Sequence, residues 1–292
     1  MKCPLCDSRV DVFRVYRTLD FFLSKEEFEI WECDHCKIRY THPFPSLSDL
    51  AKYYKSPEYF SHAQHRKNLF SLLYDTIRSI NVKWKANQIK AFYPIQGKIL
   101  DVGCGAGSFL VEMKKRGWEC TGVEPNAESR YFIKSQWNIP VYEDISLLDD
   151  KLSFQVISLW HVLEHFTDPL TSLTRIKHFL TDDGVLVVAV PNFESLDAAT
   201  FGSYWAAYDV PRHLYHFSLA GLKSLLDKAG YEIVQVKSIW VDVFYISYLS
   251  YRYLDKSLPL FRGFLKSLEI LLRANNITDY SSIVVFARKK AE

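Results

Sequence analysis

The sequence of 292 residues has no marked excess of either charge. Its 36 lysine and arginine residues are nearly balanced by 34 aspartate and glutamate residues, which leaves a net charge of +2. A chain this balanced has no bulk electrostatic attraction for nucleic acid or anionic lipid. Cysteine is also scarce, with six residues, and nothing in the sequence points to an oxidising compartment.

Long apolar runs are missing as well. The longest one near the end, Val243 to Tyr251, is interrupted by Arg252 before it is long enough to cross a bilayer. The opening residues, Met1 to Pro4, are not followed by the apolar core of a signal peptide. We therefore expect a cytoplasmic protein without a transmembrane segment. Its length and its 48% hydrophobic content suit one catalytic domain with small appendages.

Four of the cysteines form two C-x-x-C pairs near the N-terminus, Cys3 with Cys6 and Cys33 with Cys36. Apolar and polar residues alternate between the pairs, which predicts a hairpin that brings the four thiolates together as tetrahedral zinc ligands. We predict a zinc ribbon over residues 1–45 that holds a structural Zn²⁺ ion. Residues 1–40 carry seven basic and eight acidic side chains, so a nucleic-acid-binding ribbon is disfavoured.

Three alternating glycines follow a short apolar run in the middle of the chain. The run Ile99 to Val102 predicts a buried strand, and Gly103, Gly105 and Gly107 come directly after it, before a helical pattern that begins at about Ser108. Glycines in such a loop let the backbone turn sharply and let a ligand lie against the main chain. The dinucleotide motif G-x-G-x-x-G is not met, because its third glycine is replaced by Ser108.

A second predicted strand, residues 119–123, ends at Glu124, where a carboxylate can accept hydrogen bonds from both hydroxyls of a ribose. Asp101, the alternating glycines and Glu124 together resemble the first motifs of class I S-adenosylmethionine-dependent methyltransferases. The resemblance implies an α/β fold over residues 95–292, with a Rossmann-like seven-stranded sheet whose last strand is antiparallel. It also implies S-adenosyl-L-methionine as the methyl donor.

The same resemblance implies which residues contact the cofactor. Asp144 follows the third predicted strand and matches the acid that approaches the adenine amino group in this family. The expected cofactor-binding residues are Asp101, Gly103, Cys104, Gly105, Gly107, Glu124, Pro125, Asp144, Ile145, Trp160 and His161.

The run from His161 to His165, H-V-L-E-H, follows a predicted fourth strand over residues 154–160. It resembles a motif of small-molecule methyltransferases, including ubiquinone-type O-methyltransferases and sugar methyltransferases. His161 is expected at the carboxyl end of its strand beside the sulfonium, and His165 in the substrate site. The spacing does not match an H-E-x-x-H zinc site and no third ligand is evident, so no metal is predicted here.

Aromatic, histidine and arginine side chains are dense between residues 201 and 218, after a predicted fifth strand over residues 185–192. We expect this segment to face substrate, with Tyr208 and Arg212 as substrate ligands, since a guanidinium suits a nucleotide diphosphate. His213 and His216 join His161 as candidate general bases.

Two further segments are expected to surround the sheet domain. Residues 46–94 read as a helical cover with one long amphipathic helix over residues 66–93, and Tyr54 or Tyr59 is expected to cover the methionine end of the cofactor. Residues 241–275 form an insertion rich in Tyr, Phe and Leu. We favour packing of this insertion against the domain or a second subunit of a homodimer over peripheral membrane contact.

The sequence thus predicts a methyltransferase that acts on a small molecule through a histidine general base. A nucleotide-linked sugar or glycan precursor is the favoured acceptor. A ubiquinone-type O-methyltransferase and an RNA base methyltransferase are the alternatives, and the acidic balance of the ribbon disfavours RNA. The intact glycines and Glu124 argue against a module that binds cofactor without catalysis.

Overall fold

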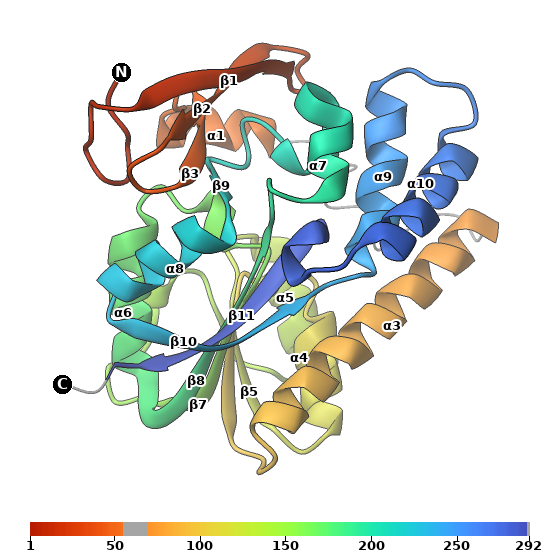
Figure 1. Ribbon diagram of the computed structural model, residues 1–292. Helices are drawn as coiled ribbons and strands as arrows, with labels where there is room; N and C mark the ends of the chain where they lie inside the picture. The colour runs from red at the N-terminus through yellow and green to blue at the C-terminus, as the bar shows by residue number, and fades with distance from the viewer. Residues whose placement is uncertain (55–68, 291–292) are drawn as a thin grey trace.

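The computed structural model describes residues 1–54 and 69–290, and a mixed sheet of seven strands forms the centre of this part of the chain (Figure 1). Five neighbouring strands are parallel, and β11 is antiparallel to both of its neighbours, β10 and β8. The fold expected from the sequence is therefore confirmed. In spatial order the strands are β10 (Tyr231–Ser238), β11 (Ser282–Lys289), β8 (Leu180–Pro191), β7 (Phe154–Trp160), β4 (Lys98–Val102), β5 (Glu119–Val123) and β6 (Val141–Tyr142).

Both faces of this sheet are covered by helices, because successive side chains of each buried strand point to opposite faces. Ile99 of β4 packs in one core with residues of α3, α4 and α5. Leu100, the next residue, packs in the other core with residues of α6 and α8. The bounds are α3 (Leu69–Phe92), α4 (Ser108–Lys115), α5 (Ala127–Trp137), α6 (Pro169–Phe179) and α8 (Leu219–Lys228).

Local sequence explains where several of these helices begin. Asn126, Asp168 and Ser218 are N-caps whose side chains accept hydrogen bonds from backbone N–H groups of the first turn of α5, α6 and α8. The long helix α3 ends at Phe92, just before Pro94, as predicted. Its expected first residues, 66–68, and Tyr59 lie outside the described residues.

The N-terminal segment forms a small antiparallel sheet of its own, with β1 (Val12–Leu19), β2 (Glu27–Cys33) and β3 (Ile38–His42). A fourth strand, β9 (Tyr215–Phe217), comes from the segment after β8 and pairs with β3, with Arg39 opposite His216. The ribbon thus shares a sheet with a segment distant in sequence. The short helices α1 (Leu47–Tyr53) and α7 (Leu196–Phe201) lie beside it (Figure 1).

The insertion between β10 and β11 consists of two packed helices, α9 (Asp242–Tyr253) and α10 (Pro259–Arg273). Gly263 allows the close approach, because an added Cβ would lie 2.7 Å from the Cα atom of Tyr248. Phe261 and Phe264 of α10 are exposed, although the Phe264 ring also contacts Phe244 of α9. Within the described residues, no helix has both the length and the apolar character needed to cross a membrane. Short 3₁₀ segments complete the chain: η2 (Ile145–Leu147), η3 (Leu163–His165), η4 (Gly202–Tyr204), η5 (Ala206–Tyr208) and η6 (Ile277–Asp279).

Candidate active site

A cavity of about 370 Å³ opens at the carboxyl ends of the central strands, where open α/β sheets usually bind ligands. The glycine loop, residues 103–107, forms one wall, and Trp160 at the end of β7 forms another. Helix α3 contributes four further side chains, and α9 contributes two together with the preceding Val241. The cavity is therefore enclosed by segments that lie far apart in the sequence.

The glycine loop needs its glycines for two different reasons. Gly103, Gly105 and Gly107 all have positive φ angles, of 69°, 54° and 74°, which strain any other residue. A Cβ at Gly103 or Gly107 would also collide with Val162 or Ile133. A Cβ at Gly105 would meet no atom of the described residues within 4 Å, since this residue borders the cavity. Gly105 thus leaves a space that a bound molecule can occupy.

Glu124 fixes this loop from the end of β5. Its Oε2 atom accepts a hydrogen bond of 2.8 Å from Gly105 N, and its Oε1 atom accepts one of 2.9 Å from Asn126 N. Each carboxylate oxygen retains a second lone pair, so these bonds leave acceptor capacity for a ribose hydroxyl. Glu124 does not itself border the cavity.

Asp101 and Lys85 place a carboxyl group and an amino group at the cavity wall. Asp101 is buried and accepts a hydrogen bond of 2.6 Å from Ser158 Oγ. Burial raises the pKa of Asp101 to about 7, against the opposing effects of Ser158 and Lys85. The Lys85 Nζ atom lies 4.6 Å from the centre of the Trp160 ring, and burial lowers the pKa of this lysine. Both pKa shifts result from burial, so these polar groups of the cavity wall are only partly exposed to solvent.

His161 lies just beyond β7 and is held between two carboxylates. Its Nε2 atom is 3.0 Å from Asp242 Oδ2, and its Nδ1 atom is 3.5 Å from Glu164 Oε1. Burial acts to lower the pKa of His161, but the two carboxylates outweigh it and raise the pKa to about 9. The backbone of His161 itself has a positive φ angle of 58°. Asp242 borders the cavity, so it links His161 to that space.

The structure brings only part of the expected cofactor set to the cavity. Asp101, Gly103, Cys104, Gly105 and Trp160 border it. Six others do not: Gly107, Glu124, Pro125, Asp144, Ile145 and His161. Asp144 instead caps η2, where its Oδ1 atom accepts a hydrogen bond from Ser146 N. The roles assigned to these side chains stay predictions.

The sequence interpretation missed the contributions of α3 and α9. Arg78, Asn81, Val82 and Lys85 of α3 border the cavity, and Arg78 Nη2 donates a hydrogen bond of 2.7 Å to Ser108 Oγ. Positions 78, 81 and 85 recur at helical spacing, which was the available signal for a polar helix face. Nothing in the sequence indicated that Asp242 and Tyr245 of α9 would reach the same cavity.

The aromatic loop, residues 204–216, uses its arginine inside the protein. Arg212 is 1% exposed, and its Nη2 atom lies 2.9 Å from Asp20 Oδ1 and 2.6 Å from Asp209 Oδ1. Its Nε atom donates a further hydrogen bond to Asp209. The guanidinium expected to meet a diphosphate is therefore occupied by two carboxylates, one of them from the ribbon. The buried Arg212 is therefore not available as the substrate ligand that the sequence predicts.

Tyr208 and His216 are also buried against the ribbon. Tyr208 Oη accepts a hydrogen bond of 2.7 Å from Arg39 Nη1, and His216 Nε2 lies 3.2 Å from Thr41 Oγ1. Burial, with the proximity of His213 and Arg39, lowers the pKa of His216 well below its usual value. Neither residue borders the 370 Å³ cavity, so we do not retain His216 as a base or Tyr208 as a substrate ligand.

His165 and His213 lie together and are only half buried. Their ring centres are 4.6 Å apart, in an edge-to-face arrangement. Tyr54 Oη lies 2.9 Å from His165 Nδ1, which places this tyrosine beside the histidines and not at the border of the cavity. Burial lowers the pKa of His165 to about 4, so its ring is neutral at neutral pH.

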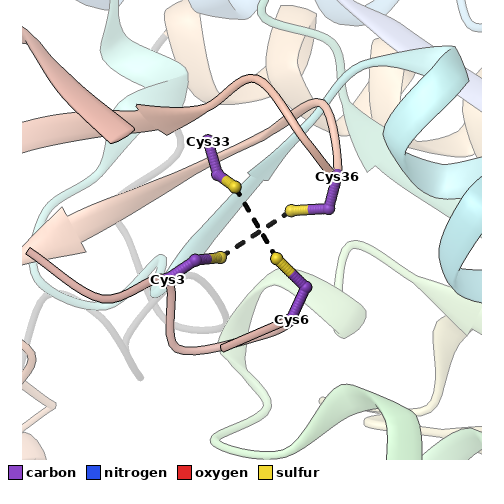
Figure 2. A group of neighbouring side chains, drawn as sticks. All are labelled: Cys3, Cys6, Cys33 and Cys36. Atoms are coloured by element: carbon purple, nitrogen blue, oxygen red, sulfur yellow. Dashed lines mark hydrogen bonds between the residues drawn. The ribbon is translucent and has the colours of Figure 1, made fainter. Parts of the chain in front are cut away.

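The four N-terminal cysteines converge as the spacing predicted. Figure 2 shows Cys3, Cys6, Cys33 and Cys36 pointing toward one centre from two turns. The Cys3 and Cys36 sulfurs are 3.7 Å apart, and those of Cys6 and Cys33 are 3.6 Å apart. Four sulfurs bound at about 2.3 Å to one tetrahedral ion would stand about 3.8 Å apart. A disulfide would need about 2 Å, so the thiols are suited to a metal and are not paired covalently.

Known proteins agree with this architecture. The methyltransferase domain family matches residues 58–236, well over half of the chain. The chain belongs to that family. It is a methyltransferase that uses S-adenosylmethionine, and the glycine loop, the open space at Gly105 and the size of the cavity suit that donor.

The similar curated proteins include ubiquinone biosynthesis O-methyltransferases. The protein of Haemophilus ducreyi is 26% identical over 48% of this chain and 67% of its own length. That of Rhodopseudomonas palustris is 26% identical over 39% of this chain and 49% of its own length. The methyltransferase thus spans between about half and two thirds of the length of these relatives.

Two solved structures share the fold. Magnesium protoporphyrin IX methyltransferase from Synechocystis, bound to S-adenosylhomocysteine, superposes with a TM-score of 0.55 and 13% identity, over 84% of this chain and all of that one. A 1,6-didemethyltoxoflavin N1-methyltransferase from Burkholderia thailandensis gives a TM-score of 0.52 and 15% identity, over 92% and 98% of the two chains. At these identities the likeness concerns the fold alone.

Proposed function

We propose that the methyltransferase methylates a hydroxyl group of a small polar molecule, with His161 as the general base. The observation that carries this proposal is the His161–Asp242 pair, which joins a histidine to the border of the cofactor cavity. Bound S-adenosylmethionine would supply an electrophilic methyl group. The chain must then hold an acceptor oxygen about 3 Å from that group and remove one proton.

Asp242 gives His161 its orientation. The carboxylate accepts the Nε2 proton at 3.0 Å, and Asn81 Nδ2 donates to the other Asp242 oxygen at 3.3 Å. The carboxylates favour the imidazolium form of His161. An additional positive charge in the cavity would shift His161 toward the neutral form that accepts a proton, because like charges lower the pKa of an imidazolium.

A nucleotide-linked sugar or glycan precursor is the acceptor class that we propose. The cavity border is rich in polar groups, and Arg78 and Lys85 offer cations that suit a diphosphate, the role first expected of Arg212. A quinol precursor is the second candidate, favoured by the ubiquinone O-methyltransferase relatives and by the aromatic rings of Trp160 and Tyr245.

The test pairs His161→Gln with His178→Gln, a change at an exposed histidine on α6. Loss of a general base should lower the methylation rate about 10²- to 10⁴-fold while leaving cofactor affinity intact. His178→Gln should turn over normally. The acceptor panel contains nucleotide sugars, quinol precursors and RNA. Equal rates for both variants would contradict the role of His161, and turnover of RNA alone would contradict the small-molecule assignment.

We also propose that the ribbon binds one structural Zn²⁺ ion through Cys3, Cys6, Cys33 and Cys36. Four thiolates leave no open position for chemistry, so the ion would stabilise the ribbon only. The sulfur separations support this ligand set. Reduced thiolates and an intracellular methyl donor suit the cytoplasm, which we propose as the compartment.

For the insertion we propose contact with an anionic membrane surface through α10, in place of the packing against a second subunit that the sequence alone favoured. Its exposed apolar residues lie beside an excess of basic ones, which favours anionic lipid over a like-charged second copy. Flotation with anionic and neutral vesicles should show binding to the anionic set alone, and Phe264→Glu should abolish it. A stable dimer in solution without vesicle binding would contradict this proposal. The exposed apolar residues of α10 are Leu260, Phe261, Phe264, Leu265, Leu268 and Leu272.

A further inference from the structure

A second group of metal-ligating side chains lies behind His161. A carboxylate oxygen of Glu164 and one ring nitrogen each of His165 and His213 all lie within 4.8 Å of one another. Glu164 and His165 belong to η3, whereas His213 comes from the aromatic loop. The two segments are joined by a hydrogen bond of 2.8 Å from Leu214 N to Glu164 O, which holds the group together.

A backbone carbonyl lies beside the Nδ1 atom of each of the two histidines. His165 Nδ1 lies 3.0 Å from Arg212 O, and His213 Nδ1 lies 2.8 Å from Ala207 O. A carbonyl oxygen only accepts, so His213 Nδ1 carries the proton and His213 Nε2 the lone pair. His165 Nδ1 also lies 2.9 Å from Tyr54 Oη, a hydroxyl that can donate or accept, so the same tautomer in His165 requires that Tyr54 Oη accept or point elsewhere. Metal-binding histidines are typically oriented in this way, with one ring nitrogen donating to a carbonyl and the other binding the ion.

Glu164 supplies the negative charge that such a set requires. The residue is fully buried, and neither carboxylate oxygen has a hydrogen-bond donor in the part of the chain that the structure describes. Its nearest cationic group there is His161 Nδ1, at 3.5 Å. Burying a carboxylate without hydrogen bonds is costly, and a bound cation would offset that cost.

We propose that Glu164, His165 and His213 form a binding site for a divalent transition-metal ion. Two imidazoles and one carboxylate suit Zn²⁺, Fe²⁺ or Co²⁺ better than Mg²⁺ or Ca²⁺, which prefer all-oxygen sets. Three protein ligands leave at least one coordination position open, unlike the four thiolates of the ribbon. The third ligand, His213, is 48 positions from His165 in the chain, so the H-V-L-E-H run alone did not reveal the site.

Cobalt binding tests this site in the full chain with zinc already on the ribbon. Titration of Co²⁺, followed by visible absorption, should show one bound ion per chain without the thiolate charge-transfer band that cobalt in the ribbon would give. His213→Gln and Glu164→Gln should each weaken binding at least about tenfold, as expected when a ligand is lost. His178→Gln, the exposed control, should bind as the wild type does.

Equal cobalt affinity in the wild type and both ligand variants would overturn the proposal, as would a spectrum with thiolate bands only. Because a ligand variant can fail to fold, a second measurement uses the unaltered protein. Crystals soaked in Co²⁺ should give an anomalous scattering peak at about 2.0–2.2 Å from all three side chains. A soaked crystal without a peak between them would also overturn it. Neither readout depends on methylation, so the outcome is independent of the acceptor and of His161.

Discussion

The glycine loop leaves its backbone open to a cavity, whereas the aromatic loop turns its polar side chains inward. Among the described residues, none fills the space where a side chain of residue 105 would stand, but Arg212 is held by Asp20 and Asp209. The ribbon makes this difference, because β3 pairs with β9 and supplies partners for the aromatic loop. A dense set of polar and aromatic residues can therefore mark an internal interface, whereas a glycine that opens onto a cavity marks a place for a ligand.

Loss of the ribbon zinc should have the largest effect of these predictions. It should destabilise the ribbon and the aromatic loop while leaving the glycine loop able to bind the cofactor. Cys33→Ser removes one of four thiolates, and zinc binding in small domains is worth about 10–16 kcal/mol of folding free energy. Elemental analysis should find the zinc lost, and hydrogen exchange should show β1 to β3 and the aromatic loop unprotected. Cofactor affinity should change less than about tenfold, since no ribbon residue borders the cavity.

Cys120→Ala serves as the control for this experiment, because Cys120 is buried in β5 and lies outside the ribbon. It should keep its zinc. Zinc retention in Cys33→Ser would contradict the metal site. Loss of cofactor binding in step with zinc would show that the two regions are not separable.

Arg212→Met should reduce stability by about 3–5 kcal/mol, because it leaves the buried carboxylate of Asp20 and the partly buried carboxylate of Asp209 without their partner. Urea unfolding of this variant is compared with Arg9→Met, which alters an exposed arginine and should change stability by less than about 0.5 kcal/mol. If Arg212→Met keeps its stability but loses acceptor binding, the arginine is a substrate ligand and the contrast between the loops fails.

Replacing Asp101, which lies beside the glycine loop, should have a smaller effect, namely on how stability depends on pH. Its pKa is raised to about 7 in the folded protein from an ordinary value of 3.8. Between pH 4 and pH 7 the folded state therefore binds the proton more tightly than the unfolded state, and this group makes stability fall as the pH rises. Thermal unfolding without cofactor should show a shallower fall for Asp101→Asn. An unchanged pH profile would contradict the burial of a protonated carboxyl here.

Much of the fold could be predicted from the sequence, because it depends on local signals. The apolar run before Gly103, the N-cap Asn126 and the paired cysteines are each readable within a few residues, and the structure agrees with them. The environment of Arg212 and the grouping of Glu164 with His213 depend on contacts between distant segments. One sequence does not record which distant residues meet, so it predicts a substrate role for Arg212, whose guanidinium is paired inside the protein, and it gives no sign of the group of Glu164 with His213.

The same limit applies around the cofactor cavity. Asp101 and Gly105 were expected there, since they belong to a motif with fixed spacing. Lys85 belongs to α3, which packs against the sheet, and Asp242 belongs to α9, which packs against α10. Their position at the border of the cavity follows from the three-dimensional fold and not from a local sequence motif.

Cofactor titration of Gly105→Val beside Gly117→Val tests the central claim most directly, namely that the open space at Gly105 is where S-adenosylmethionine binds. Both glycines have positive φ angles, of 54° and 86°, so valine should cost each variant a similar backbone strain of about 1–2 kcal/mol. Only Gly105 borders the cavity, whereas a Cβ at Gly117 meets Gln96 at an ordinary 3.6 Å. Calorimetry should show affinity lowered at least about tenfold in Gly105→Val and nearly unchanged in Gly117→Val. Equal affinity in the two folded variants would contradict the account.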